Sequence, residues 1–281
     1  LEEELPGVFV DADVDAANLD LLIGASQAEP HPFSGGETAQ INSGACMVCG
    51  ICEDVCRFDA VTFNEGTGQF EIDPLACEGC AACHYQCPEG AIAMVPSLAG
   101  QWFRSESRFG PLFHARLRPA QENSGKLVAL IKEEAASTAS EAGYPFTIVD
   151  GPPGIACPAI AAITGAQWVL IVAEPTVAGI HDLERALGMV GHFSIDVLVC
   201  INKADLYPEG VRMIQERCRN AGVRVLGTIP FDETVTQSLL EGRPITEFRP
   251  DASASLALKE LWRKIRNLLT NQRRSVQLPV L

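Results

Sequence analysis

Eight of the eleven cysteines fall into two runs with the same spacing, Cys-x-x-Cys-x-x-Cys-x-x-x-Cys, offset by 31 residues. Three thiolates at this spacing surround one four-iron, four-sulfur (4Fe-4S) cluster, and the fourth cysteine reaches the other cluster when two runs pair. We therefore predict two 4Fe-4S clusters with crossed ligands. Cluster one takes Cys46, Cys49, Cys52 and Cys87, and cluster two takes Cys77, Cys80, Cys83 and Cys56.

Zinc is the alternative metal for such cysteines. Zinc sites use Cys-x2-4-Cys pairs separated by a longer gap, which leaves the close-set repeat unexplained. One position departs from the ferredoxin spacing, since the second run ends in Cys87-Pro88 but the first ends in Cys56-Arg57. The chemistry expected of the cysteine-rich segment is one-electron transfer.

Acidic residues crowd the end of the first expected strand. Asp11, Asp13 and Asp15 follow the apolar segment Val8 to Val10. Their mutual repulsion is relieved by a cation, and Mg²⁺ carried by a nucleotide supplies one. The alternative is a set of solvated surface acids that includes one helix cap.

A second acid, Asp150, follows the apolar segment Phe146 to Val149 and opens the sequence Asp-Gly-Pro-Pro-Gly. This is the position from which a Walker-B aspartate reaches Mg²⁺, and Gly154 would belong to a loop that senses the γ-phosphate. A plain turn is the alternative, because Pro-Pro-Gly is also ordinary turn chemistry.

A candidate base-binding group follows two later strands. Asn202 and Asp205 come after the apolar segment Ile195 to Ile201, and Pro230 lies in the sequence that closes the next strand. An Asn amide can read a purine edge, and an Asp can accept guanine N–H groups. On this chemistry alone both ATP and GTP stay open.

These residues need a scaffold that brings strand ends together. Apolar strands alternate with helices after residue 145, as they do in parallel βα units. Strands are expected at 146–149, 168–173, 195–201 and 223–229, and helices at 157–164, 179–191, 209–221 and 252–269. We predict an α/β fold with a doubly wound, mostly parallel sheet, whose ligand site lies at the carboxyl ends of the strands.

The earlier part of the chain is less regular. Residues 24–40 are expected to form a loop, 99–118 a hairpin and 124–142 a helix. Short strands are expected at 60–63 and 91–94, one after each cysteine run. We place an inserted α+β ferredoxin-like domain at 41–98, between parts of a nucleotide-binding domain at 1–40 and 99–281.

The formal net charge of -15 argues against nucleic acid or an anionic membrane as a binding partner. No apolar run approaches the ~18 residues of a membrane span, and residues 1–6 do not read as a secretory signal, so we expect a cytoplasmic protein. The last helix carries basic residues opposite an apolar stripe that we expect to face the core rather than a membrane. Those residues are Lys259, Arg263, Lys264 and Arg266.

Five strings, VDADVDAANLDLL, VDGPPG, VAEPTVAGIHDLERAL, VLVCINKADL and GTIPFD, stand in this order around the cysteine-rich insert. They closely resemble MinD-superfamily P-loop ATPases that contain an inserted ferredoxin domain. The resemblance implies that ATP and Mg²⁺ bind between the two subunits of a homodimer. It also implies that Asp13 is the switch I acid, Asp11 its neighbour near the metal or water, Asp150 the Walker-B acid and Asn202 the adenine reader.

One motif of that family is missing from the sequence. No G-x-x-x-x-G-K-[ST] string occurs, and the nearest one, Asn123 to Lys126, lacks the leading glycine spacing and the hydroxyl. We assign Lys126 no phosphate role, and we expect the first strand and the P-loop to be absent from this chain. Nucleotide binding and hydrolysis should then be weak.

Cys157 stands seven residues after Asp150, where the related nitrogenase iron protein has a ligand of its subunit-bridging cluster. Two subunits would offer only two thiolates there, so a small buried core residue is the alternative. Cys200 and Cys218 are expected to be packing residues.

Two functions fit the sequence. The first is an iron-sulfur protein that couples ATP binding and hydrolysis to electron transfer, or to cluster transfer, toward a redox or cluster-acceptor protein. The second is a ferredoxin-type electron-transfer or cluster-binding protein whose α/β domain is a scaffold without hydrolysis.

Overall fold

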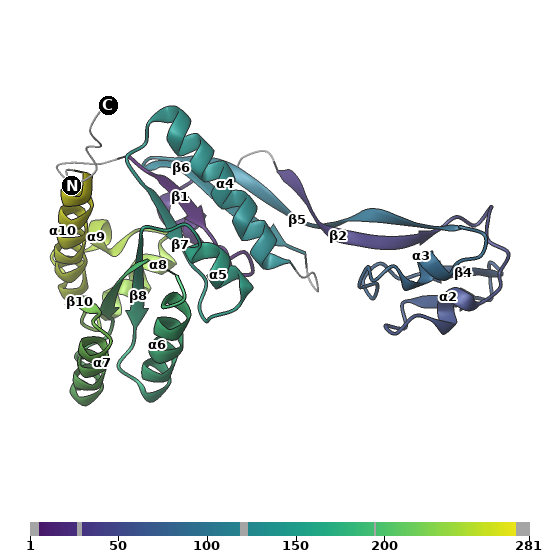
Figure 1. The fold of residues 1–281 in the computed structure, drawn as a ribbon. Coiled ribbons are helices and arrows are strands. Elements are labelled where there is room, and N and C mark those ends of the chain that lie inside the picture. The colour runs from purple at the N-terminus through teal and green to yellow at the C-terminus, as the bar shows by residue number, and fades with distance from the viewer. Residues whose placement is uncertain (1–5, 27–29, 119–122, 194, 274–281) are drawn as a thin grey trace, which may run out of the picture.

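The computed structural model describes residues 6–26, 30–118, 123–193 and 195–273 of the 281-residue chain. An α/β body carries a smaller cysteine-rich part at the end of a long two-stranded projection (Figure 1). We call residues 42–91, which lie between the two strands of this projection, the cysteine module.

The body contains a five-stranded sheet in the order β2-β5-β6-β1-β7. β1 lies between β6 and β7 and runs parallel to both, whereas β5 is antiparallel to β6 and to β2. The strands are β1 (Val8–Asp11), β2 (His31–Ile41), β5 (Ile92–Ser107), β6 (Gly110–Leu117) and β7 (Thr147–Asp150). The hairpin expected at 99–118 is therefore confirmed as the β5–β6 pair.

A second, fully parallel sheet has the order β10-β9-β8. Its strands are β8 (Trp168–Ala173), β9 (Asp196–Ile201) and β10 (Arg224–Thr228). The helices that follow β7 are α5 (Cys157–Ile163), α6 (Val177–Val190), α7 (Pro208–Asn220), α8 (Glu233–Leu240), α9 (Ile245–Phe248) and α10 (Ser253–Arg273). The alternation of strand and helix confirms the expected α/β class and its mostly parallel strands.

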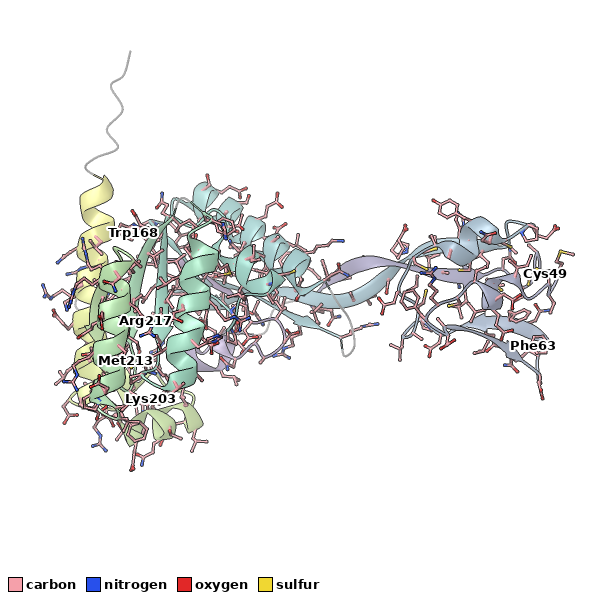
Figure 2. The ribbon with its side chains drawn as sticks, turned by 60° about the horizontal axis from the view of Figure 1, so that its bottom comes forward. Cys49, Phe63, Trp168, Lys203, Met213 and Arg217 are labelled. Carbon is pink, nitrogen blue, oxygen red and sulfur yellow. The ribbon has the colours of Figure 1, made fainter. Side chains whose placement is uncertain are left out.

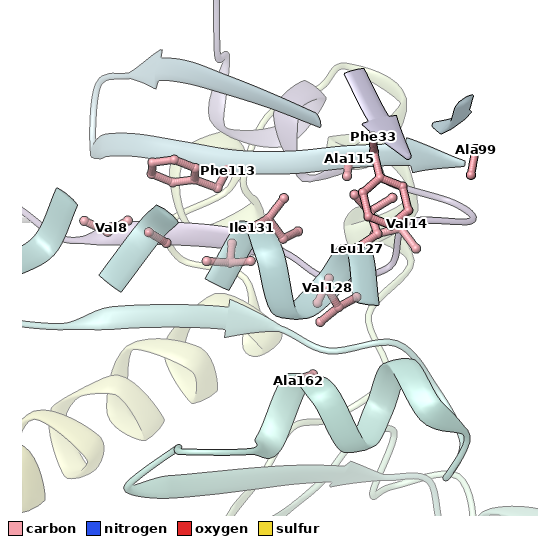
Figure 3. Packing of buried hydrophobic residues seen from close by; sticks show 13 residues of the cluster. Val8, Val14, Phe33, Ala99, Phe113, Ala115, Leu127, Val128, Ile131 and Ala162 are labelled. Atoms are coloured by element: carbon pink, nitrogen blue, oxygen red, sulfur yellow. The ribbon is translucent and has the colours of Figure 1, made fainter. Parts of the chain in front are cut away.

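Helix α4 (Ser124–Ala142) covers the five-stranded sheet through a helical stripe of apolar residues. Leu127, Val128 and Ile131 are fully buried and pack against Val8 and Phe113 of the sheet, as Figure 3 shows. Burial of such side chains stabilises the fold by about 1.5–3 kcal/mol each. This packing holds β1, whose carboxyl end carries the first acidic residues.

The expected loop at 24–40 is wrong for residues 31–40. β2 pairs antiparallel with residues 92–102 of β5, from His31 opposite Trp102 to Ile41 opposite Ile92. We call this pair the ribbon. Proline and glycine in this segment favour a loop. Pro32 is nevertheless tolerated because β2 is an edge strand of the sheet. The register shifts near Ser34 accommodate the glycines.

The ribbon runs across both expected domain boundaries, since β2 ends at Ile41 and β5 begins at Ile92. The short strand expected at 91–94 is thus the start of a 16-residue strand. Within the cysteine module lie α2 (Ile51–Asp54), the hairpin β3 (Val61–Asn64) and β4 (Gln69–Ile72), and α3 (Ala82–Gln86). The same two continuous strands therefore belong to the body and support the module.

No helix in the described part of the chain is long and apolar enough to cross a membrane.

Lys132 of α4 joins this helix to α5. Its ammonium donates to the carbonyl oxygens of Ala161, Ala162 and Thr164 at 2.6, 2.7 and 2.7 Å. These carbonyls lie at the end of α5, where no further turn of helix supplies N–H donors. Burial lowers the pKa of Lys132, so the three acceptors are needed to hold the charged form there.

We expect Lys132→Met to lower the free energy of unfolding by about 1–3 kcal/mol, because three carbonyl oxygens lose a charged donor. Thermal unfolding followed by circular dichroism under anaerobic conditions measures the change. Lys126→Met on the exposed side of the same helix is the matched control and should change the midpoint little. Equal midpoints for the two variants would contradict the assigned role of Lys132.

Candidate functional site

Two cysteine-lined cavities open on the surface of the module. The first is lined by Cys46, Cys49, Cys52 and Cys87. Apolar residues, among them Ile41, Phe70 and Ile92, complete its wall. Three of the four sulfurs thus come from the first run and the fourth from the end of the second run, which is the crossed grouping expected from the spacing.

The second cavity has the reciprocal lining of Cys77, Cys80, Cys83 and Cys56. Ala39, Val61 and Ile72 contribute to its apolar wall.

The cysteine module is distant from the α/β body: Cys49 lies at the end of the molecule far from Trp168 and Lys203 (Figure 2).

The two cysteine loops share one backbone pattern. The second and fourth residues after the first cysteine have positive φ in both runs: Val48 (57°) and Gly50 (82°), then Gly79 (65°) and Ala81 (60°). For Val48 and Ala81 this conformation is sterically costly and persists only where the surroundings impose it. The repeat in sequence is therefore also a repeat in backbone geometry.

Backbone amides donate to three of the sulfurs. Val48 N contacts Cys46 Sγ at 3.4 Å, Ala91 N contacts Cys87 Sγ at 3.3 Å, and Ala39 N contacts Cys77 Sγ at 3.5 Å. Such donors favour the thiolate, which is the form that binds iron.

Burial raises the pKa of Cys52 and of Cys83, and neighbouring cysteines of the same run raise both further. Four thiolates around an apolar cavity therefore need a cationic group between them.

The sulfurs of each set surround a cavity rather than one point. Within the described residues, no three His, Cys, Asp or Glu side chains are arranged to hold a single metal ion. A polynuclear iron-sulfur group fits this arrangement better than one zinc ion, which requires four ligand atoms at about 2.0–2.3 Å.

A second group of candidate residues lies where β1 and β7 end. Asp11 is directly opposite Asp150 in the parallel ladder, and Asp13 follows two residues later. We call Asp11, Asp13 and Asp150 the strand-end site.

The carboxylate of Asp11 is 1% exposed and is occupied by backbone amides. Its Oδ1 accepts from Asp13 N at 3.2 Å, and its Oδ2 accepts from Asn18 N and Leu19 N at 3.0 Å. These bonds fix the loop between β1 and α1 (Leu19–Ile23). Asp11 therefore positions the backbone of Asp13.

The pKa of Asp150 is raised above its usual value. The surrounding chain removes part of its water, and the charges of Asp11 and Asp13 repel a third negative charge. The three carboxylates therefore concentrate negative charge where β1 and β7 end.

The loop after β7 leads past Gly154, which has φ 86°, to α5. Cys157 is the exposed first residue of α5 and lies against the first turn of α4, where a Cβ on Gly125 would meet the Cys157 Cβ at 3.2 Å. The prediction of a buried core residue is therefore wrong for Cys157, because α5 begins at the surface.

Asn202, Asp205 and Pro230 are brought together by two loops that follow β9 and β10. Asp205 Oδ1 accepts from Phe231 N at 2.6 Å, and Ala204 N donates to Ile229 O at 3.0 Å. One oxygen of Asp205 thus holds the loop that contains Pro230. These residues and the strand-end site belong to the ends of strands in different sheets.

Sequence reasoning gave no role to Glu174, which follows β8. Its Oε1 contacts Lys203 Nζ at 2.6 Å, and Lys203 itself has φ 51° directly after Asn202. The signal in the sequence that could have identified Glu174 is its position as an acid immediately after a parallel strand. Sequence reasoning also missed Ala39, because nothing in the segment 24–40 indicated a strand beside the cysteines.

The chain is similar in sequence and in fold to known proteins. The family model described as a 4Fe-4S dicluster domain matches residues 45–91. The uncharacterized protein MJ0578 of Methanocaldococcus jannaschii is 31% identical over 262 residues, which covers 93% of this chain and 86% of that protein.

The cytosolic Fe-S cluster assembly factor NUBP2 of Bos taurus is 29% identical over 137 residues, covering 43% of this chain and 50% of that protein. Among solved structures, the septum site-determining protein MinD of Pyrococcus horikoshii, complexed with Mg-ADP, matches with a TM-score of 0.53 and 15% identity. That match covers 93% of this chain and 83% of the other, and it supports a common fold.

The raised pKa of Asp150 predicts that Asp150→Asn stabilises the protein near neutral pH. Because the pKa is raised in the folded state, that state binds more protons than the unfolded state at pH values above the unfolded pKa of about 3.9. The free energy of unfolding therefore falls as the pH rises from about 3.9 through the folded pKa. The variant should therefore have the higher unfolding midpoint at pH 7, with the difference disappearing at pH values below about 3.9. Asp15→Asn, an exposed acid of the neighbouring loop, is the control. A wild-type midpoint at pH 7 equal to or above that of Asp150→Asn would contradict the assignment.

Proposed function

We infer the function from the premise that this chain belongs to the MinD superfamily of P-loop ATPases, in the family of MJ0578, and contains an inserted 4Fe-4S dicluster domain. We propose that it binds two 4Fe-4S clusters and couples ATP binding and hydrolysis to electron transfer or to the transfer of iron-sulfur clusters. The observation that carries the proposal is the pair of cavities with reciprocal cysteine linings.

When bound, 4Fe-4S clusters supply one-electron chemistry at potentials tuned by hydrogen bonds and exposure. The eight thiolates of the two linings would hold them. Val48, Ala91 and Ala39 donate their amides to ligand sulfurs, and the apolar walls limit access of water. These contributions belong to the chain itself and favour retention of the clusters.

The strand-end site supports the nucleotide part of the proposal. Asp13 and Asp150 would bind Mg²⁺ directly or through water, and Asp11 would position them through the loop amides that it accepts. A cation there relieves the repulsion that raises the pKa of Asp150. Gly154 would approach the terminal phosphate, and Asn202, Asp205 and Pro230 would surround the base.

A homodimer with nucleotide between the subunits is part of the same proposal. Apolar side chains next to the strand ends are exposed: Val177 at the start of α6 by 82%, Leu206 before α7 by 60% and Phe231 after β10 by 44%. Exposed apolar groups around a binding site support contact with a second copy of the chain.

The proposed partner of the clusters is a redox protein or a cluster acceptor. The similarity to NUBP2, which is named a cytosolic Fe-S cluster assembly factor, supports the cluster-transfer branch. Residues 42–91 contain eight acidic residues and one basic residue. This charge favours a partner with a basic docking surface.

The second candidate function is electron transfer or cluster binding on an α/β scaffold that does not hydrolyse nucleotide. It is favoured by the two reciprocal cysteine linings and by the match of residues 45–91 to a 4Fe-4S dicluster domain, neither of which involves a nucleotide.

Anaerobic iron and labile-sulfide analysis of the reconstituted chain, with low-temperature EPR after dithionite reduction, tests the cluster part. We expect about eight iron and eight sulfide per chain. A spectrum that changes on addition of Mg-ATP supports coupling, whereas an unchanged spectrum supports the scaffold function. Zinc in place of iron would contradict both.

Combined cysteine substitutions test the crossed ligation. Replacing Cys46 and Cys49 by Ala should leave about four iron, and adding Cys87→Ala should remove little more, because all three line the same cavity. Replacing Cys77 and Cys80 by Ala should also leave about four, but there Cys87→Ala should remove the rest.

Cys157→Ala is the matched control, since it removes an exposed cysteine outside both linings and should leave the iron content unchanged. Equal iron loss from Cys87→Ala in the two double-variant backgrounds would mean that the ligands are not crossed.

A further inference from the structure

The two cysteine-lined cavities contact the ribbon at different points. The second cavity is lined by Ala39, whereas the first is lined by Ile41 and by Ile92, which pair with each other at the far end of the ribbon. Two residues of strand separate these positions, about 7 Å along the ribbon. The cluster-two site is therefore the inner one, nearer the α/β body.

Among the described residues, the sulfur hydrogen bond that β2 donates goes to the second cavity. Ala39 is 6% exposed, and its amide donates to Cys77 Sγ at 3.5 Å. β2 is an edge strand, so an amide directed away from β5 is free for this bond. The donors to the first cavity, Val48 and Ala91, lie within the cysteine module itself.

A close backbone approach holds the second cysteine loop on the same strand. Gly79, between Cys77 and Cys80, has φ 65°, and a Cβ there would meet Glu37 O at 2.2 Å. A contact that short requires the loop or the strand to move. Gly90 in the same module also has a positive φ, 60°, but a Cβ there meets nothing within 4 Å. A comparison of the two glycines therefore separates the effect of the contact with β2 from the effect of a positive φ.

β2 connects this contact to the core of the body without a break in the strand. Phe33 is 7% exposed and packs in the cluster formed by β1, β6 and α4, beside Val14 and Leu127 (Figure 3). From Gly36 to Ile41 the ladder with β5 has no register shift. Ala39 is six residues from Phe33, about 20 Å along a strand.

We propose that two contacts of β2, the Ala39 amide and the close approach of Glu37 to Gly79, complete the cluster-two site and set the reduction potential of cluster two, while the potential of cluster one is independent of these two contacts. The two clusters then differ in one defined respect, which is the hydrogen bond that β2 donates to a ligand sulfur of cluster two. A movement of the ribbon relative to the module changes the hydrogen bond to Cys77 and leaves those to Cys46 and Cys87 intact.

The direction of the effect follows from charge. Reduction adds an electron to a cluster that already carries thiolate ligands, and an N–H dipole pointing at a ligand sulfur stabilises the added negative charge. Loss of the Ala39 donor therefore lowers the potential of cluster two.

The first test is Ala39→Pro, which removes the N–H donor to Cys77 Sγ. The hydrogen bonds between β2 and β5 should remain, because the Ala39 amide donates to the sulfur and not to β5. A redox titration of the whole reconstituted protein, followed by EPR, should show one midpoint shifted downward and the other unchanged. Ala39→Gly keeps the amide and is the control. Selective loss of cluster two, with about four iron retained, would equally support the proposal.

Gly79→Ala tests the same contact without a change in β2, and Gly90→Ala is its matched control. We expect the downward shift in Gly79→Ala and no shift in Gly90→Ala. The shifted midpoint is assigned by repeating the Gly79→Ala titration in the two double-cysteine backgrounds: it should persist when Cys46 and Cys49 are replaced and be absent when Cys77 and Cys80 are replaced. Unchanged midpoints in both Ala39→Pro and Gly79→Ala, or a shift in cluster one, would overturn the proposal.

This inference rests on the proposed function only for the presence of two clusters, and its outcome can be told apart from that of the ATP coupling. If Mg-ATP shifts the cluster-two midpoint in the wild-type protein, the shift should be reduced in Gly79→Ala. If Mg-ATP shifts neither midpoint, the ATP-coupled function fails, whereas the Ala39→Pro and Gly79→Ala titrations still decide whether β2 tunes cluster two.

Discussion

The backbone pairing between β2 and β5 joins the cysteine module to the five-stranded sheet that carries the strand-end site. The same two strands form the outer part of the five-stranded sheet and the support of the cysteine module. A flexible linker would have let the module move independently of the body. A paired ribbon instead makes the position of Ala39 beside Cys77 dependent on how β2 is packed at Phe33.

Charge is the second constraint, and the two sites handle it differently. In the module, buried thiols have raised pKa values and require positive charge from a metal group before they persist as thiolates. In the body, Asp11 is stabilised without a cation because three backbone amides surround its carboxylate, while Asp150 keeps a raised pKa beside it. The carboxylate of Asp11 thus stabilises the loop after β1, whereas the charge of Asp150 is opposed by its surroundings.

The internal repeat gives the module approximate symmetry, but its attachment removes the equivalence of the two halves. Both cysteine loops have left-handed residues at the same positions, yet glycine is the second residue after the first cysteine only in the second loop. That glycine, Gly79, is the one that lies against β2, whereas the corresponding Val48 carries a side chain. Equal local geometry with unequal surroundings is sufficient to give two similar clusters different potentials.

The sequence by itself determined the grouping of the cysteines, the alternating strands and helices after residue 145, and the acids at strand ends, since each depends on spacing or on short-range periodicity. It did not determine β2, because Pro32, Gly35 and Gly36 favour a loop locally and only pairing with a distant strand, β5, makes the segment extended. Nor did it reveal that the Asp11 carboxylate would be used by the amides of Asn18 and Leu19, or that Ala39 would donate to Cys77 across 38 residues. These contacts were decided by the tertiary structure, because a backbone amide carries no signature in the sequence and acquires a partner only when the chain is folded.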